Sequence, residues 1–269
     1  MISAKMVKEL RDKTGAGMVD CQKALKAANG DVELAIENLR KAGIAKAEKK
    51  SGRAATQGKV WTSISDKDAA IVELLIETDF AAKTPKFSDF VQVVANDARE
   101  LDAEGDVTAQ INEKDAAAIT NNIAIIGENM QLRRAIRWTT DGSTKFAGYH
   151  HMDGRVSVLV EVEGEDDAEV LNDICLHVAA FNPPYIQPSD IPAEVIQKEK
   201  EIAAAADPKL AGKPAEMLEK ILAGKINRYY SEKCLMNQPW IRDDKTTLAK
   251  IKPNLKVKRI VRWSVGEEI

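Results

Sequence analysis

The stretch AAIVELLIETDFAAKTP, residues 69–85, contains the features that decide how the centre of this chain folds. Its first eight residues form an apolar run of the length typical of a buried strand. Thr84 and Pro85 then offer an N-cap and a first helical residue, so we expect a helix to begin there. Between strand and helix, Asp79 and Phe80 lie on a short turn. Such turns lie at the surface, where a large apolar ring gives up a place in the core.

Phe80 has two interpretations. It can fold back onto the preceding strand, and position alone favours this, because single apolar residues on surfaces are common. It can instead face solvent and meet a partner, with Asp79 beside it; Asp79 alone would be read as a cap flanking the helix. Met18 and Val19 raise the same question, because they follow a glycine turn and can either pack between helices or contact a partner.

The composition is that of an ordinary globular protein. The 269 residues suffice for two or more domains, and 44% are hydrophobic and 30% charged. The net charge of −3 lacks the basic excess that nucleic-acid binders need. No segment approaches a membrane span, and the N-terminus enters an amphipathic pattern without an apolar signal core. We therefore expect a cytoplasmic protein with neither nucleic-acid nor membrane partners.

Enzyme chemistry has no evident site in this sequence. The three cysteines are far apart, which argues against a disulfide framework and a zinc site. His150 and His151 are adjacent on an expected strand, so their side chains point to opposite faces and cannot share a metal. His177 lies at the edge of an apolar helix stripe and is expected to be a packed core histidine. Because phosphate-loop, nucleophile-elbow and dinucleotide motifs are also missing, we expect a binding protein without cofactor or metal.

Residues 1–45 predict a compact unit of three short helices. Ser3 is a candidate N-cap for the first helix, and the turn Thr14–Gly17 separates it from the second. Asp31 is placed to cap the third helix. A basic stretch rich in small residues, 46–58, then indicates a solvated linker.

The remaining chain predicts an α+β fold built from two related subdomains. Residues 59–140, core subdomain N, show a β-hairpin, two helices, the second starting at about Glu113, and a closing strand. Residues 141–269, core subdomain C, repeat this plan. The closing strands RRAIRW at 133–138 and KRIVRW at 258–263 share their basic and aromatic positions, which indicates an internal duplication. We expect helices covering antiparallel sheets and the arginines solvated on one sheet face.

A helical hairpin interrupts core subdomain C at about 186–228. Two amphipathic helices are expected there, with a break at 207–214. Such a hairpin can contact a partner, fold back, or pair with a second copy to give a homodimer or a two-plus-two complex.

Ten short motifs, in order along the whole chain, resemble those of bacterial translation elongation factor Ts. They are Thr14–Met18, Asp20–Leu25, Asn29–Asp31, Ala35–Glu37, Thr78–Lys83, Ile126–Asn129, Arg133–Arg134, His177–Ala180, Gln238–Pro239 and Val265–Glu267. The resemblance implies a guanine-nucleotide exchange factor, not an enzyme, that binds elongation factor Tu in its GDP-bound and nucleotide-free forms and speeds GDP release so that GTP can rebind. It also implies that residues 1–45 resemble a ubiquitin-associated three-helix domain that docks on the partner.

Three groups of contact residues are implied by the same resemblance. The motif that intrudes beside the magnesium site of elongation factor Tu corresponds to Thr78, Asp79, Phe80, Ala81, Ala82 and Lys83. The N-terminal docking contacts correspond to Arg11, Met18 and Val19. A contact from the second subdomain corresponds most nearly to His151, with His150 as its neighbour. The sequence ends at Glu268-Ile269, where many members continue into a C-terminal helical module, so contacts made there are expected to be absent or replaced.

Two other function classes stay open at this point. A ubiquitin-associated-type adaptor would place all binding within the first 42 residues. A hydrolase would need His151 or His177 beside a nucleophile in a cleft.

Overall fold

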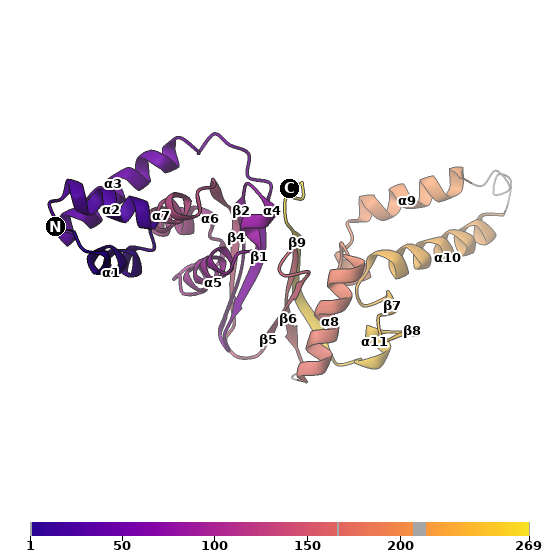
Figure 1. Cartoon of the computed structure of the whole chain (residues 1–269). Coiled ribbons are helices and arrows are strands. Elements are labelled where there is room, and N and C mark those ends of the chain that lie inside the picture. Colours follow the sequence, from indigo (N-terminus) through magenta and orange to yellow (C-terminus); the bar gives the residue numbers. More distant parts are fainter. Residues whose placement is uncertain (1, 166, 207–213, 269) are drawn as a thin grey trace. The chain divides into compact units, whose positions relative to one another are not determined.

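The computed structural model describes residues 2–165, 167–206 and 214–268, and the chain divides into two compact units (Figure 1). The first contains the described residues up to Thr139, together with His150–Ser157 and the described residues from Trp263 onward. The second contains Thr140–Tyr149 and Val158–Arg262. Most of the break predicted at 207–214 lies outside the described residues.

The chain begins with three helices, α1 (Ala4–Thr14), α2 (Met18–Ala27) and α3 (Val32–Glu48). The predicted caps are confirmed: Ser3 Oγ accepts from the Met6 amide at 3.2 Å, and Asp31 Oδ1 accepts from the Leu34 amide at 3.0 Å. The three helices share a small apolar core of Val7, Leu10, Cys21, Ala24, Leu25, Ala28 and Ala35. Since α3 continues to Glu48, its last residues overlap the predicted linker.

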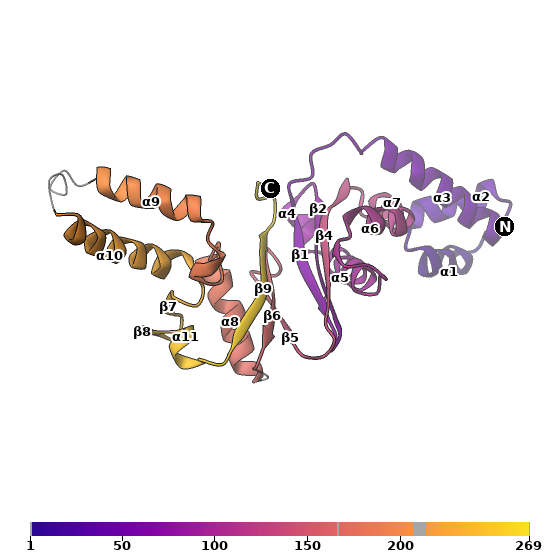
Figure 2. The same ribbon diagram turned by 180° about the vertical axis from the view of Figure 1, so that it is seen from behind.

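The first sheet forms the centre of the first unit. Its strand order is β1-β2-β4-β3, with every neighbouring pair antiparallel. The strands are β1 (Gln57–Ile64), β2 (Asp68–Ile76), β3 (Gly105–Asp106) and β4 (Met130–Thr139). The helix α5 (Pro85–Arg99) packs against β1 and β2 (Figures 1 and 2). It buries the side chains of Phe87, Phe90, Val91 and Val94. Thr84 caps α5 as predicted, accepting from the Phe87 amide at 3.3 Å.

Two details of this unit differ from the prediction. The helix expected from about Glu113 is a pair, α6 (Thr108–Lys114) and α7 (Ala116–Ile126), which meet at Asp115. Asp115 adopts φ −97° and ψ 4° with its side chain buried, and aspartate is a weak helix former. Strand β3 was not predicted, because two residues carry no readable periodicity.

The second sheet has the order β5-β6-β9. Its strands are β5 (Lys145–His151), β6 (Val156–Glu163) and β9 (Lys256–Ser264). The helix α8 (Ala168–Phe181) packs Ile174 and Val178 against the apolar side chains of β6. Smaller elements complete the second unit: the 3₁₀ turn η1 (Pro188–Asp190), β7 (Pro239–Trp240), β8 (Asp243–Thr247) and α11 (Leu248–Ile251). This mixed architecture confirms the α+β class.

The predicted hairpin consists of α9 (Ala193–Ala205) and α10 (Ala215–Lys233), which lie side by side in both views (Figures 1 and 2). It therefore extends beyond residue 228. Among its described residues only Ile226 is buried, and Ile202 and Met217 are each about half exposed.

The repeated strands make matching contacts in their own units. Arg134 pairs with Glu73 on β2, and Arg259 pairs with Glu161 on β6. Arg137 Nε donates to the carbonyl of Arg99 at the end of α5, at 2.7 Å. Arg262 Nε donates at 3.0 Å to a carbonyl near the end of α8. These equivalent contacts give the duplication a three-dimensional counterpart.

The prediction that the arginines are solvated is wrong for the first unit. The side chains of Arg133, Arg134 and Arg137 are only 20, 15 and 10% exposed. The β2–β4 ladder shifts register beside Glu73, so Arg133 has no directly paired residue, and both it and Arg134 reach the same carboxylate. Glu73 is fully buried and also accepts from the Gly266 amide at 2.8 Å. The buried acid draws the arginines inward.

This cluster predicts a large effect of a small substitution. Glu73→Gln keeps the shape but removes the negative charge facing two mostly buried guanidinium groups, so it should lower the free energy of unfolding by about 3 kcal/mol. Urea denaturation measures this. Glu100→Gln is the control, since the Glu100 carboxylate is 62% exposed and pairs with neighbouring Arg99, and it should change the free energy by less than about 1 kcal/mol. Equal effects of the two substitutions would contradict the account.

Candidate partner-binding surface

A one-turn helix, α4 (Asp79–Ala82), follows directly after β2. Its N-cap is Thr78, whose Oγ1 accepts from the Ala81 amide at 3.2 Å, so Asp79 is the first helical residue and not the cap. Ala81 and Ala82 are buried. Successive helical residues are rotated by about 100°, so burying these two alanines turns the preceding side chain outward.

Phe80 is 81% exposed, more than any other large apolar side chain among the described residues. The interpretation in which Phe80 folds back onto its strand is therefore wrong. An exposed aromatic ring on a fixed helical turn is the arrangement expected of a residue that enters a partner's pocket.

Asp79 and Lys83 form an ion pair one helical turn apart, with 2.8 Å between Asp79 Oδ2 and Lys83 Nζ. The hydrogen bond from the Lys83 ammonium lowers the pKa of the Asp79 carboxyl. Asp79 is thus an anion at neutral pH, and its side chain is still 46% exposed. It can accept further hydrogen bonds or approach a cation.

The turn that follows α7 holds α4 in place. Glu128 accepts two hydrogen bonds from Thr78, one from its backbone amide at 2.9 Å and one from its hydroxyl at 2.8 Å. The next residue, Asn129, donates its backbone amide to Glu77 Oε1 at 2.6 Å. Sequence reasoning missed these roles of Glu77, Glu128 and Asn129. The sequence marks Ile126–Asn129 as a motif, but a contact between residues 50 positions apart leaves no local pattern.

The predicted docking residues lie on either side of the turn that connects α1 to α2. Gly15, at φ 64°, ends α1, and Gly17 precedes α2, so the chain reverses tightly and presents the first residues of α2 to solvent. Met18 is 46% exposed and Val19 62% exposed. Arg11, near the end of α1, is also exposed. The structure therefore brings Met18 and Val19 to the surface, and packing between helices is not their role.

The two adjacent histidines have different environments. His150 stacks on Trp61 with ring centroids 3.9 Å apart, and its ring nitrogens contact Ser157 Oγ at 2.9 Å and Thr62 Oγ1 at 3.3 Å. His151 is exposed. Of the pair, His151 is the more exposed to solvent.

Two residues that a hydrolase could use, His177 and Cys175, are buried on α8. His177 is buried as predicted, with its Nε2 2.9 Å from Gln238 Oε1 and its ring against Trp240 and Phe181. Burial raises the pKa of the Cys175 thiol to about 12, which suppresses the thiolate. Within the described ranges, His, Cys, Asp and Glu side chains form no group of three that could hold a metal. Among the described helices, none is both long and apolar enough to cross a membrane.

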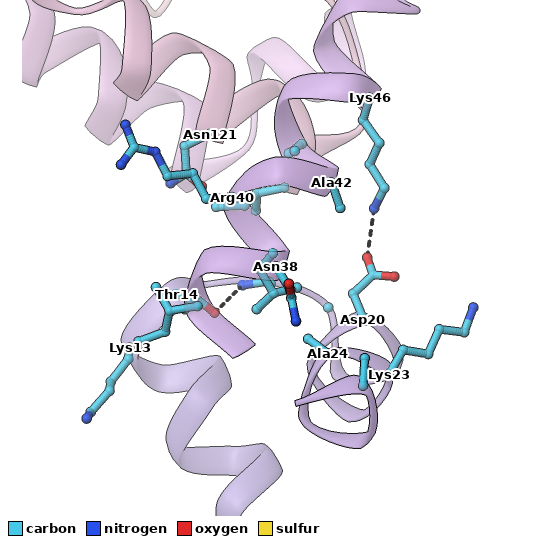
Figure 3. Close-up of a pocket in the computed structure, with 18 of the residues that line it drawn as sticks. Lys13, Thr14, Asp20, Lys23, Ala24, Asn38, Arg40, Ala42, Lys46 and Asn121 are labelled. Atoms are coloured by element: carbon cyan, nitrogen blue, oxygen red, sulfur yellow. Dashed lines mark hydrogen bonds and ion pairs between the residues drawn. The ribbon is translucent and has the colours of Figure 1, made fainter. Parts of the chain in front are cut away.

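A cavity of about 550 Å³ lies between α2, α3 and α7 (Figure 3). Alanine side chains provide much of its lining, and an ion pair between Lys46 and Asp20, 2.8 Å long, lies at its edge. Lys13 and Lys23 extend away from the cavity (Figure 3). Ligand sites need polar groups that converge on the ligand, whereas the four charged residues just named either pair with each other or extend away. It also contains none of the predicted site residues.

Comparison with known proteins identifies the family. The family model described as elongation factor TS matches residues 77–267, which is most of the chain. The chain belongs to the elongation factor Ts family. The resemblance read from the sequence motifs is thereby confirmed, and α4, the Gly127–Asn129 turn and both repeated strands lie within the matched range.

Individual relatives cover the whole chain. Elongation factor Ts of Halothermothrix orenii is 43% identical over 282 residues, covering 100% of this chain and 93% of the relative. Elongation factor Ts of Thioalkalivibrio sulfidiphilus is 43% identical over 280 residues with the same coverage. Elongation factor Ts of Protochlamydia amoebophila is 36% identical over 282 residues, covering 99% of both chains.

The histidine stack predicts a pH-dependent stability. Burial, with a smaller contribution from the Lys59 charge, lowers the pKa of His150 to about 4. Its pKa in the unfolded chain is about 6.5, so below that pH the unfolded state binds a proton that the folded state does not. Stability is therefore lost as the pH falls from about 6.5 toward 4, by about 2 kcal/mol between pH 7 and pH 5.

Urea denaturation at pH 7 and pH 5 measures this loss. His150→Gln, which cannot titrate, should lose about 2 kcal/mol less than the wild type over the same interval. An identical loss in both proteins would show that His150 does not contribute.

Proposed function

We propose that this protein is a guanine-nucleotide exchange factor of translation elongation that acts on elongation factor Tu in the cytoplasm. It binds the GDP-bound form, disturbs the magnesium and phosphate site of the partner, and promotes GDP release so that GTP can rebind. It makes and breaks no covalent bond, so it is a binding protein and not an enzyme. The observation that carries the proposal is the exposed Phe80 on a fixed helical turn, within a chain of the elongation factor Ts family.

Phe80 supplies most of the energy in this proposal. Burying an aromatic side chain removes about 150–250 Å² from water. At about 25 cal/mol per Å² this is roughly 4–6 kcal/mol before the cost of distorting the partner. The ring is already exposed and its helix already formed, so binding does not first have to unpack it. The ring can therefore insert into the partner without a prior unfolding cost, and we call Phe80 the wedge for this reason.

Asp79 directs the effect of binding to the magnesium site of the partner. A carboxylate beside the wedge can compete for Mg²⁺ or its water ligands, and GDP is held less tightly once the ion is disturbed. Asp79 is ionised at neutral pH, as this role requires, and the hydrogen bond from Lys83 lowers its pKa further. Asp79 is already paired with Lys83, so binding to Mg²⁺ or its water ligands would replace that ion pair. The pair is exposed to solvent and such pairs are weak, so replacing it costs little free energy.

Docking completes the mechanism. Arg11, Met18 and Val19 are each exposed and would hold the nucleotide-binding domain of the partner, and His151 offers a second contact. The factor must bind the nucleotide-free partner more tightly than the GDP-bound one. By linkage, GDP then weakens the factor's binding by the same ratio.

Two other proposals have weaker support. The exposed Met18 and Val19 would also suit a ubiquitin-associated-type adaptor, but an adaptor gives no role to the exposed Phe80. Assembly into a homodimer or a two-plus-two complex through α9 and α10, or through core subdomain C, remains a proposal that rests on the sparse burial within the hairpin. The division into residues 1–45, 46–58, 59–140 and 141–269 likewise stays a prediction.

The exchange activity is tested by substituting the wedge. Phe80→Ala should cost at least about 2 kcal/mol, or about thirtyfold in the efficiency of GDP release, because it removes a binding hot spot. The melting temperature should not fall, since the ring is exposed. The measurement is a stopped-flow chase of fluorescent GDP from elongation factor Tu, with the melting temperature recorded for each variant.

Val93→Ala is the matched control. Val93 is also an exposed apolar residue, at 50%, but it lies on α5, away from the motif. Its substitution should leave GDP release unchanged. A Phe80→Ala protein that releases GDP as fast as wild type, or that melts several degrees early, would refute the wedge.

A further inference from the structure

The turn Gly127–Asn129 connects to two segments that are distant in sequence. Gly127, at φ 90°, ends α7, and its carbonyl accepts from Lys50 Nζ. Glu128 contacts Thr78, the cap of α4. Asn129 contacts the chain that leaves α3. One short turn therefore joins α1–α3, which we call the docking helices, to the helix that carries Phe80.

Glu128 controls how Thr78 caps α4. Both carboxylate oxygens are used on this one residue, one for its amide and one for its hydroxyl. A hydroxyl has a single hydrogen, and here it is given to Glu128. The oxygen of Thr78 is then left as an acceptor for the Ala81 amide. Glu128 thus orients the cap of the helix that carries Phe80.

Asn129 ties down the segment after α3. It is buried, and its side-chain amide donates to the carbonyls of Ser51 at 3.4 Å and Arg53 at 2.8 Å. Its backbone amide donates to Glu77, whose other oxygen lies 3.5 Å from Arg53 Nη1. Much of the predicted linker is exposed, but residues 50–53 are anchored at these points.

We propose that Glu128 and Asn129 are positioning residues, which lock α4 to the chain leaving α3 so that docking and insertion of Phe80 occur as one rigid action. This rests on the proposed exchange function. A rigid connection lowers the ordering cost when two separate surfaces engage one partner, and it keeps Phe80 aimed when the docking helices bind. If the connection loosens, the docking contacts persist but Phe80 enters less often.

The proposal predicts which kinetic parameter changes. Glu128→Ala should lower the maximal rate of GDP release at saturating factor about tenfold. The concentration of factor giving half of that rate should change less than threefold, because Met18 and Val19 still dock. Glu128→Gln should stay within threefold of wild type on both parameters, since its amide oxygen can accept from the Thr78 backbone and its amide nitrogen can donate to the Thr78 hydroxyl.

The experiment is the stopped-flow GDP chase with the full chain over a range of factor concentrations, with the melting temperature of each variant. Glu113→Ala is the matched control, because Glu113 is an exposed glutamate on α6, and it should match wild type.

Asn129→Ala tests the connection to the chain leaving α3. In the wild-type background the effects of Met18→Ala and Phe80→Ala on GDP-release efficiency should be non-additive by at least threefold, and in the Asn129→Ala background they should become additive.

The outcomes separate this proposal from the proposed function. If Phe80→Ala does not slow GDP release, the exchange mechanism itself fails. If Phe80→Ala slows release and Glu128→Ala does not, only the positioning role is overturned. A Glu128→Ala protein that melts well below wild type, or a Glu128→Gln protein as slow as Glu128→Ala, also overturns it. Additivity in both backgrounds overturns the role of Asn129.

Discussion

The local constraint behind the site is the burial of Ala81 and Ala82 beneath a cap fixed at Thr78. A single turn of helix has little stability of its own, so it forms only where its ends and its inner face are held. With the inner face committed to two small side chains, Phe80 has only solvent to face. Exposing such a ring gives up the stabilisation that its burial would provide, and a folded protein usually sacrifices this where a binding site needs it.

The strand before this turn is rigid for electrostatic as well as hydrophobic reasons. Glu73 lies near the middle of β2 and accepts hydrogen bonds from two arginines of β4 and from the Gly266 amide. The strand also buries all of its large apolar side chains. Because β2 runs directly into α4, the motif starts from a fixed point. A site built on a rigid element keeps its geometry better than one on a loop.

The sequence predicts those parts of the molecule that depend on neighbouring residues. Ser3, Asp31 and Thr84 cap helices as predicted because a cap is a contact over three residues. The strands of both sheets follow from apolar alternation and turn residues. The roles of Phe80 and Met18 could be narrowed to two interpretations, but exposure depends on what packs beneath them, and only the structure decides it.

Contacts between distant segments could not be predicted in the same way. The arginines of β4 looked like a solvated face until Glu73 proved to be their shared partner. The hydrogen bonds of Glu128 and Asn129 reach segments 50 residues or more away. No local pattern marks such partners, and a single sequence gives no covariation to reveal them.

The central claim is that Phe80 favours the nucleotide-free state of elongation factor Tu and does not simply add affinity. A ligand shifts an equilibrium only through its different affinities for the two states. The direct test is the dissociation constant of wild type and Phe80→Ala for nucleotide-free and for GDP-bound elongation factor Tu, measured by titration calorimetry. The account predicts that the substitution weakens binding to the nucleotide-free form about thirtyfold and to the GDP-bound form less than threefold. Equal weakening of both would contradict it, because Phe80 would then be a docking contact without a role in exchange.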